Sequence, residues 1–309
     1  MRGLSGQKWT GMLALSTIAF CAGLCPVRGD AVAKDLVVEK DIVFGTGDGQ
    51  ELKLDLYQPK SHVENEKSVL PGLIVIYGGA WRSGNKDVMR ILCEQFARAD
   101  YVVAAVSYRL FPKYRFPACV EDCKCGVRWL RDEASKRRIN PDRIGAMGMS
   151  AGGHLSMMLG YMDPKDGLEG DGGHATQNSQ VQCVVNYFGP FNMTLRDWDP
   201  KDEHLLVDFL NGNLDEKRED YLRASPSSYV DSDDAPTISI HGTKDPLVPY
   251  GQAVLADKVL KENGVPSELV PVDGAGHGWW GPNLQRTQKM AIQFLDKHLK
   301  PTESASAGK

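Results

Sequence analysis

The stretch RIGAMGMSAGGHLSMMLG, residues 143–160, decides the fold of this 309-residue chain. It begins as a short apolar run that suits a buried strand, and it ends in an apolar run that suits a helix. Between the two lies the pentapeptide Gly148-Met149-Ser150-Ala151-Gly152, a G-x-S-x-G motif. A tight turn from strand to helix needs glycine where backbones crowd, and it lifts the central side chain above the edge of the sheet. The stretch therefore predicts a strand–turn–helix that presents Ser150 as a nucleophile.

Strand and helix patterns alternate on both sides of this stretch. Continuous apolar runs predict further buried strands at 73–77, 102–106, 181–187, 237–240 and 268–272. Alternating patterns at 36–44 and 52–57, around the turn 45–49, predict an antiparallel hairpin. Helical patterns lie between the strands at 86–99, 118–137, 151–160, 250–263 and 283–299. The alternation predicts an α/β fold with one mostly parallel, eight-stranded sheet and helices on both faces.

Two stretches interrupt the alternation. Residues 163–180 are rich in Gly, Asp and Asn, which predicts a surface loop. Residues 188–236 contain four prolines and many acidic residues, which predicts a small cap insertion between two strands. We expect a single α/β domain over residues 34–300, followed by a disordered polar tail at 301–309.

The first 33 residues have the pattern of a secretory signal peptide. Arg2 and Lys8 precede the uncharged stretch from Met12 to Leu24, and Ala31-Val32-Ala33 offers a small-residue cleavage site. The uncharged stretch is short for a membrane span, which needs about 20 apolar residues. We expect a secreted or periplasmic protein without stable membrane insertion after cleavage. An uncleaved anchor and a disordered cytoplasmic tail are the alternatives.

Composition excludes several classes of protein. With 42% hydrophobic and 25% charged residues, the chain can bury a core and is not intrinsically disordered over most of its length. A net charge of -4 without a basic cluster argues against nucleic-acid binding.

Five cysteines follow the signal segment: Cys93, Cys119, Cys123, Cys125 and Cys183. Cys119 and Cys123 recur with apolar residues at helical spacing, which predicts packing residues rather than a metal site. One disulfide remains possible. We expect no metal and no organic cofactor.

A serine hydroxyl needs a base to become a nucleophile, and His277 is the candidate. It lies on a glycine-rich loop just after the strand predicted at 268–272, and Asp245 follows the strand predicted at 237–240. Asp245 can accept the second imidazole N–H and hold the tautomer, while the N–H of Ala151 can donate to an oxyanion. The rival histidines lack this placement, and we expect His154 to be a packing residue. The rivals are His154, His174, His204 and His241.

The order Ser150, Asp245, His277 along the chain is the order found in α/β-hydrolases. The segment YGGAWRSG at 77–84 resembles the HGGGW loop of the carboxylesterase and acetyl esterase branch, near the hormone-sensitive-lipase group. It also resembles the domain of bifunctional acetylxylan/feruloyl esterases. Further segments resemble that family's connecting segments: Ser107-Tyr108-Arg109-Leu110, Phe116-Pro117-Ala118, Glu121-Asp122, Val127-Arg128-Trp129-Leu130-Arg131, Asn140-Pro141-Asp142-Arg143-Ile144 and Ser150-Ala151-Gly152-Gly153-His154.

The resemblance covers nearly all of the chain after the signal segment and implies the α/β-hydrolase fold. It implies that Gly79 and Ala80 donate backbone N–H groups to an oxyanion and that Trp81 packs beneath the loop. Two positions depart from the family pattern: Tyr77 stands where the family usually has His, and Ala80 where it often has Gly.

These features predict a secreted serine hydrolase that cleaves carboxylic esters through an acyl-enzyme. The alternatives are an amide hydrolase or peptidase on the same fold, and a non-catalytic binding module. The short insertion offers little apolar wall for a long acyl chain, so we expect a short-chain, acetyl-preferring esterase. Its expected substrate is a small ester or an acetylated carbohydrate such as xylan, and the oligomeric state is left open. Aromatic side chains that could bind a sugar ring are Trp81, Trp198, Trp279 and Trp280.

Overall fold

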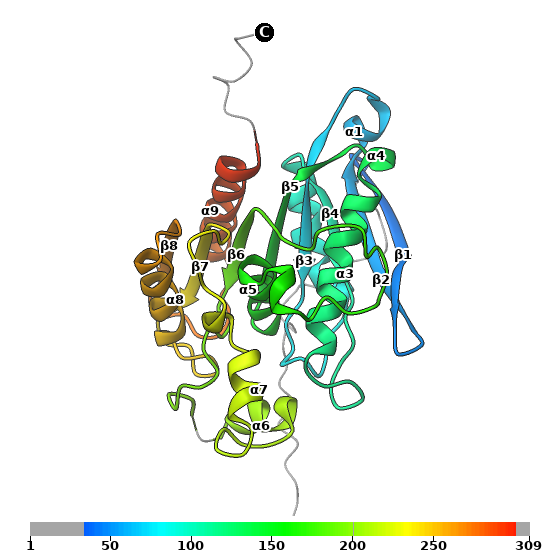
Figure 1. Ribbon diagram of the computed structural model, residues 1–309. Coiled ribbons are helices and arrows are strands. Elements are labelled where there is room, and N and C mark those ends of the chain that lie inside the picture. Colours follow the sequence, from blue (N-terminus) through cyan, green and yellow to red (C-terminus); the bar gives the residue numbers. More distant parts are fainter. Residues whose placement is uncertain (1–33, 200, 301–309) are drawn as a thin grey trace, which may run out of the picture. The chain divides into compact units, whose positions relative to one another are not determined.

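One eight-stranded sheet organises the part of the chain that the structure, a computed structural model, describes: residues 34–199 and 201–300 (Figure 1). The expected signal peptide and polar tail lie outside the described residues. The strands are β1 Leu36–Gly47, β2 Gln50–Pro59, β3 Leu70–Ile76, β4 Val102–Val106, β5 Ile139–Met149, β6 Cys183–Tyr187, β7 Thr237–Gly242 and β8 Ser267–Val272. The helices are α1 Lys60–Glu64, α2 Arg90–Arg98, α3 Ala118–Asp132, α4 Ala134–Arg137, α5 Ala151–Tyr161, α6 His204–Leu210, α7 Arg218–Arg223, α8 Gly251–Glu262 and α9 Pro282–Leu299.

The sheet order is β1-β2-β4-β3-β5-β6-β7-β8. Strands β3 to β8 pair in parallel, whereas β2 pairs antiparallel with both β1 and β4. The predicted fold class is therefore confirmed. Parallel strands place their carboxyl ends at one edge of the sheet, and that edge is where such sheets bind ligands.

Helices cover both faces of the sheet, as its register shows. A Cβ placed on Gly126 of α3 would lie 3.1 Å from the side chains of Ile74 and Val106, so α3 covers their face. A Cβ on Gly145 of β5 would lie 2.9 Å from Leu299 of α9. Gly145 pairs with the residue of β3 that precedes Ile74. Paired residues of neighbouring strands point to the same face, and successive residues of one strand point to opposite faces, so Gly145 and Ile74 face opposite sides of the sheet. Helices α3 and α9 therefore lie on opposite faces, which accounts for strands buried on both sides.

Three of the differences from the expected element boundaries change the local structure. The hairpin turn is two residues long, Asp48 and Gly49, because both adopt the positive φ that a tight hairpin requires. The helix expected at 86–99 begins with a 3-10 turn at Lys86–Met89, where the Asn85 side chain accepts the Asp87 N–H. The helix expected at 118–137 is two helices, since α3 ends at Asp132 and α4 begins at Ala134.

The cap insertion contains α6, α7 and a 3-10 turn at Pro226–Ser228. Figure 1 shows α6 and α7 side by side at the lower end of the view, beyond the strands. No helix among the described residues has both the length and the apolarity needed to span a membrane. The five cysteines named above are buried free thiols, so none of them forms the disulfide left open by the sequence.

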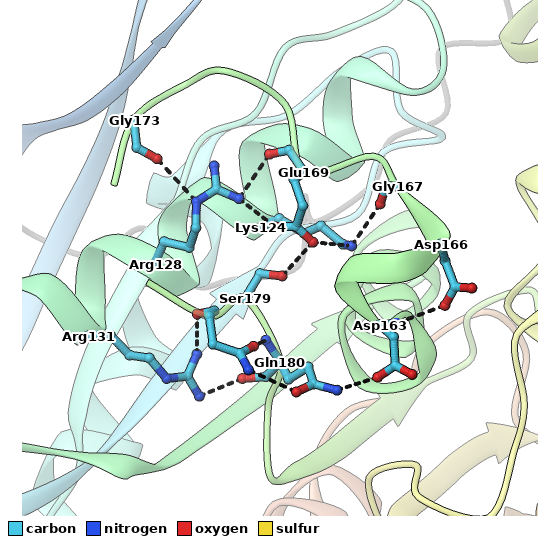
Figure 2. Close-up of polar contacts among 11 residues, drawn as sticks. Lys124, Arg128, Arg131, Asp163, Asp166, Gly167, Glu169, Gly173, Ser179 and Gln180 are labelled. Carbon is cyan, nitrogen blue, oxygen red and sulfur yellow. Dashed lines mark hydrogen bonds and ion pairs between the residues drawn. The ribbon is translucent and has the colours of Figure 1, made fainter. Parts of the chain in front are cut away.

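Buried cations hold the 163–180 loop against α3 (Figure 2). The Glu169 carboxylate lies 2.7 Å from Lys124 Nζ and 2.8 Å from Arg128 Nη1, and both cations are almost wholly buried. Ser179 Oγ donates to Glu169 at 2.9 Å. Burial acts to raise the pKa of Glu169, but the hydrogen bond and charge of Lys124 outweigh it and hold the pKa below its ordinary value. One carboxylate is thus the counter-ion of two buried cations.

Replacing Glu169 by Gln leaves those two cations without a counter-charge, which destabilises a folded protein. We expect Glu169→Gln to lower the free energy of unfolding by roughly 2–4 kcal/mol in urea denaturation. The exposed Lys258–Glu262 pair is the matched control, and Glu262→Gln should cost under about 1 kcal/mol. Equal effects of the two substitutions would contradict the special role of Glu169.

Candidate active site

Ser150 lies in the turn between β5 and α5, with φ 55° and ψ −121°. This left-handed backbone is uncommon for a residue with a side chain and is held by a hydrogen bond from the Ser150 N–H to the Tyr187 carbonyl at 2.8 Å. A Cβ on Gly148 would lie 2.1 Å from the Gly152 carbonyl oxygen, and a Cβ on Gly152 would lie 2.1 Å from the Ile76 carbonyl oxygen. Glycine is therefore required on both sides of Ser150 by close backbone contact.

Three side chains from three different loops form one hydrogen-bonded chain. His277 Nε2 lies 2.9 Å from Ser150 Oγ, and His277 Nδ1 lies 2.7 Å from Asp245 Oδ2. A carboxylate can only accept, so Nδ1 carries a hydrogen, and in the tautomer with this one hydrogen Nε2 accepts from the serine hydroxyl. This arrangement of a serine, a neutral imidazole and a carboxylate can generate an alkoxide-like nucleophile.

The Asp245 carboxylate is buried and receives hydrogen bonds on both oxygens. Oδ1 accepts the backbone N–H groups of Leu247 and Val248 at 2.9 and 3.0 Å, while Oδ2 lies 3.2 Å from His241 Nε2. Burial acts to raise the pKa of Asp245, but the hydrogen bonds from His241 and His277 prevail and hold the pKa far below its ordinary value. Asp245 is therefore a fixed negative charge beside His277.

The loops after β7 and β8 are hydrogen-bonded to each other, which fixes the position of Asp245 relative to His277. The Lys244 N–H donates to the Ala275 carbonyl at 2.9 Å, and the Gly274 N–H donates to Thr243 Oγ1 at 2.9 Å. Phe188, just after β6, packs against the His277 ring with centroids 4.7 Å apart. The imidazole thus has both its partners and its orientation determined by neighbouring loops.

The loop after β3 lies directly against the serine. A Cβ on Gly78 would lie 2.7 Å from the Met149 carbonyl oxygen and 3.0 Å from Ser150 Cβ. The Gly79 carbonyl accepts two backbone N–H groups from the end of the loop, at 3.1 Å each. Ala80 adopts φ +52°, so it occupies the left-handed region although it is not glycine. The candidate oxyanion donors Gly79 and Ala80 therefore lie on a tightly closed loop beside Ser150, and Ala151 opens α5 next to it.

Tyr77, which replaces the usual His at the start of this loop, is buried in the core. Its ring stacks on Tyr108 with centroids 4.4 Å apart, and its hydroxyl lies 3.5 Å from the Tyr108 carbonyl. In return the Tyr108 hydroxyl donates to the Tyr77 carbonyl at 3.1 Å. Ring stacking and this hydrogen bond hold the base of the loop.

The structure corrects the expectation that Trp81 and Trp279 present ring faces to a sugar. Trp81 is 3% exposed and stacks on Phe209 with centroids 4.3 Å apart. Trp279 is 8% exposed, and its Nε1–H donates to Thr287 Oγ1. Ring faces that are packed in the core cannot stack on a ligand.

The other two candidate aromatic residues differ in exposure. Trp198 is partly buried and packs against the core. Trp280 is 57% exposed, which leaves it the most accessible of the four.

Sequence reasoning undervalued two histidines. His241, dismissed as a rival base, instead contacts Asp245, four residues along the chain. His154 is wholly buried as expected, but it also hydrogen-bonds Trp81 Nε1 at 3.1 Å and the Ala224 carbonyl at 2.7 Å. The spacing of His241 and Asp245 could have signalled the first role, whereas nothing in the sequence pairs His154 with Trp81.

The two remaining rival histidines lie in other surroundings. His174 contacts Asp132 and the Phe44 carbonyl. His204 contacts the Lys201 carbonyl. Within residues 34–199 and 201–300, no group of three or more His, Cys, Asp or Glu side chains is arranged to hold a metal ion.

The chain is similar to proteins that are named as esterases. Residues 54–260 match the model of the BD-FAE family. An arylesterase of Saccharolobus solfataricus is 37% identical over 286 residues, which are 87% of this chain and 86% of that protein. The chain spans about half the length of some other curated relatives, such as 53% of Esterase LipQ of Mycobacterium tuberculosis (strain ATCC 25618 / H37Rv).

Two solved structures extend the comparison. A truncated carbohydrate esterase from gut microbiota superimposes with a TM-score of 0.76 at 27% identity, covering 87% of this chain and 99% of that one. The propionate-bound esterase Est2 of Thermogutta terrifontis superimposes with a TM-score of 0.71 at 28% identity, covering 87% and 97%.

Because a Cβ at Gly148 would collide with the Gly152 carbonyl, Gly148→Ala should destabilise the fold by roughly 3 kcal/mol or more in urea denaturation. Gly251→Ala is the matched control, since the nearest atom to its new Cβ lies at 3.9 Å. The control should be neutral or slightly stabilising. A Gly148→Ala protein as stable as the control would show that the turn can relax.

Burial lowers the pKa of His154 to about 4, from an ordinary value of 6.5. The unfolded chain therefore takes up this proton first as the pH falls, and the stability present above pH 6.5 is lost progressively toward pH 4. The loss at this site is about 3 kcal/mol at most. His154→Gln should flatten the dependence of unfolding free energy on pH in this window. Parallel curves for wild type and His154→Gln would contradict the assignment.

Proposed function

Because the chain belongs to the BD-FAE family of α/β-hydrolase esterases, we propose that it is a serine hydrolase that cleaves carboxylic esters. The observation that carries this proposal is the continuous hydrogen-bonded chain from Asp245 through His277 to Ser150. A lone serine between glycines would need none of these partners. The arylesterase and the carbohydrate esterase described above support an ester rather than another substrate class.

In the proposed reaction, Ser150 Oγ attacks the carbonyl carbon of the ester while His277 Nε2 takes the hydroxyl proton. The carbonyl oxygen becomes an oxyanion that the N–H groups of Gly79, Ala80 and Ala151 stabilise. His277 then donates its proton to the departing alcohol, which leaves an acyl-enzyme on Ser150. Water then attacks the acyl carbon while His277 takes its proton, and the C–O bond to Ser150 breaks, which releases the carboxylic acid as His277 returns the proton to Ser150 Oγ. Asp245 stabilises the imidazolium formed in each step.

The proposed substrate is an ester with a short acyl group, on a small alcohol or an acetylated carbohydrate. The cap helices support this size limit, because α6 has seven residues and α7 has six, which offers little apolar wall. Est2, which has been solved with propionate bound, also points to short acyl groups. Among the four candidate aromatic residues we propose Trp280 as the one that contacts a sugar, because it is exposed and lies three residues after His277 in the sequence.

Export of the protein completes the proposal. Residues 1–33 carry the signal-peptide pattern, and an extracellular or periplasmic location brings the enzyme to acetylated carbohydrate outside the cell. No nucleic-acid partner, metal or organic cofactor enters the reaction as proposed.

Ser150→Ala should reduce kcat for p-nitrophenyl acetate by roughly 10⁴ to 10⁶-fold, as removal of a catalytic serine does elsewhere. Urea denaturation should show the variant to be folded, since only an oxygen is removed. Labelling by a fluorophosphonate should vanish in the same variant. Wild-type turnover or labelling in Ser150→Ala would overturn the assignment, and an unlabelled, inactive wild type would favour a binding module.

A series of p-nitrophenyl esters should show kcat/KM falling from acetate through octanoate to palmitate, because the short cap cannot bury a long chain. Each buried methylene contributes about 0.8 kcal/mol only where an apolar wall receives it. Acetate release from acetylated xylan, measured in parallel, tests the carbohydrate substrate. Palmitate turnover equal to that of acetate would contradict the size limit. Faster cleavage of p-nitroacetanilide than of p-nitrophenyl acetate would favour an amidase.

A further inference from the structure

The loop that carries the proposed oxyanion donors is strained at two consecutive positions. Ala80 and Trp81 have φ of +52° and +57°, a region that side-chain-bearing residues seldom adopt. Such strain persists only where neighbouring contacts hold it in place. Contacts with other parts of the protein must therefore stabilise the positive φ of Ala80 and Trp81 against the conformational preference of the two residues.

The indole of Trp81 supplies that hold through three contacts. Its Nε1–H donates to His154 Nδ1 at 3.1 Å, and its ring meets the His154 ring edge-on with centroids 5.3 Å apart. Its face stacks on Phe209 of α6 with an interplanar angle of 9°. The Trp81 carbonyl also accepts the Phe111 N–H at 3.0 Å.

His154 can serve Trp81 only in one protonation state and one tautomer. An indole N–H can only donate, so His154 Nδ1 must be unprotonated, and the Ala224 carbonyl can only accept, so Nε2 carries the hydrogen. The side chain is wholly buried, which keeps the imidazole neutral. His154 is also the residue whose N–H donates to the Ser150 carbonyl at 3.0 Å, one helical turn after the nucleophile.

We propose that His154 is a positioning residue that sets the oxyanion donors Gly79 and Ala80 relative to Ser150 by anchoring the Trp81 indole. One imidazole joins three parts of the site: the helix that begins after Ser150, the loop after β3, and the cap. The inference rests on the proposed ester hydrolysis, and it goes beyond it by giving a catalytic consequence to a buried residue outside the triad.

The cap contributes both remaining surfaces of this anchor. Ala224 directly follows α7 and accepts from His154, while Phe209 of α6 covers the face of Trp81. The cap insertion therefore helps to fix the position of the oxyanion donors through residues that need not contact the substrate. A displacement of the cap would shift His154 and Trp81 and, through them, the donors Gly79 and Ala80.

The direct test is Trp81→Phe, which keeps an aromatic ring against Phe209 but removes the Nε1–H donor. The probe is 1,1,1-trifluorobutan-2-one, whose carbonyl carbon bonds to Ser150 Oγ while the proton passes to His277 and the carbonyl oxygen becomes an oxyanion. We expect kcat/KM for p-nitrophenyl acetate and the affinity for this ketone to fall by the same factor, roughly tenfold. An inhibition constant does not depend on the fraction of active protein. A substitution that only lowers the amount of correctly folded protein would therefore leave the inhibition constant unchanged.

His154→Phe and the double variant complete the cycle. If both residues act through their shared hydrogen bond, the double variant should lose much less than the product of the two single losses. Trp129→Phe is the matched control, because Trp129 is buried to a similar extent on α3, and it should leave both measurements unchanged.

The outcomes separate this inference from the function on which it rests. A folded, active wild type whose Trp81→Phe variant binds the ketone as tightly as before overturns the inference alone. Losses that multiply in the double variant also overturn it, because the residues then act independently. A wild type without esterase activity overturns the proposed function and this inference together. If His154→Phe does not fold, Trp81→Phe and the ketone decide.

Discussion

The left-handed turn at Ser150 is the constraint on which the rest of the site depends. The turn brings the backbones of β3, β5 and α5 within contact distance, and side chains at Gly148 and Gly152 would close that space. Because the serine backbone itself bonds to the Tyr187 carbonyl at the end of β6, three neighbouring strands contribute to one turn. Asp245 and His277 can act on the Ser150 hydroxyl only because this turn holds the hydroxyl within hydrogen-bond distance of His277.

Buried polar groups around the site are paired so that each one limits the orientation of the next. Asp245 accepts from two backbone N–H groups and two histidines, which leaves its charge fixed and His277 in one tautomer. His154 is held in one tautomer by a donor on one side and an acceptor on the other. Groups oriented in advance need not reorganise when charge develops, and this is how a protein stabilises an oxyanion better than water does.

The aromatic residues of this region have mainly a structural task. Trp81 and Trp279 lie close to the proposed catalytic groups in sequence, yet their rings fill the core rather than facing solvent. Trp81 holds a strained loop, and Trp279 packs with Phe188, which in turn contacts His277. Their positions in the sequence suggested contact with a sugar, whereas in the structure these rings pack against Phe209 of the cap and against Phe188 beside His277.

The sequence by itself determined the parallel sheet, the opening hairpin and the strand–turn–helix at Ser150, because these depend on local periodicity and on glycine spacing. It also placed Asp245 and His277 after adjacent strands, since the carboxyl ends of parallel strands share one edge. Only the tertiary structure decided which aromatic rings are exposed and which histidines pair with which partners. The Trp81–His154 contact joins residues 73 positions apart, and His154 meets a cap carbonyl 70 positions further on. Such pairings depend on how helices and cap pack against the sheet, and no local pattern encodes that packing.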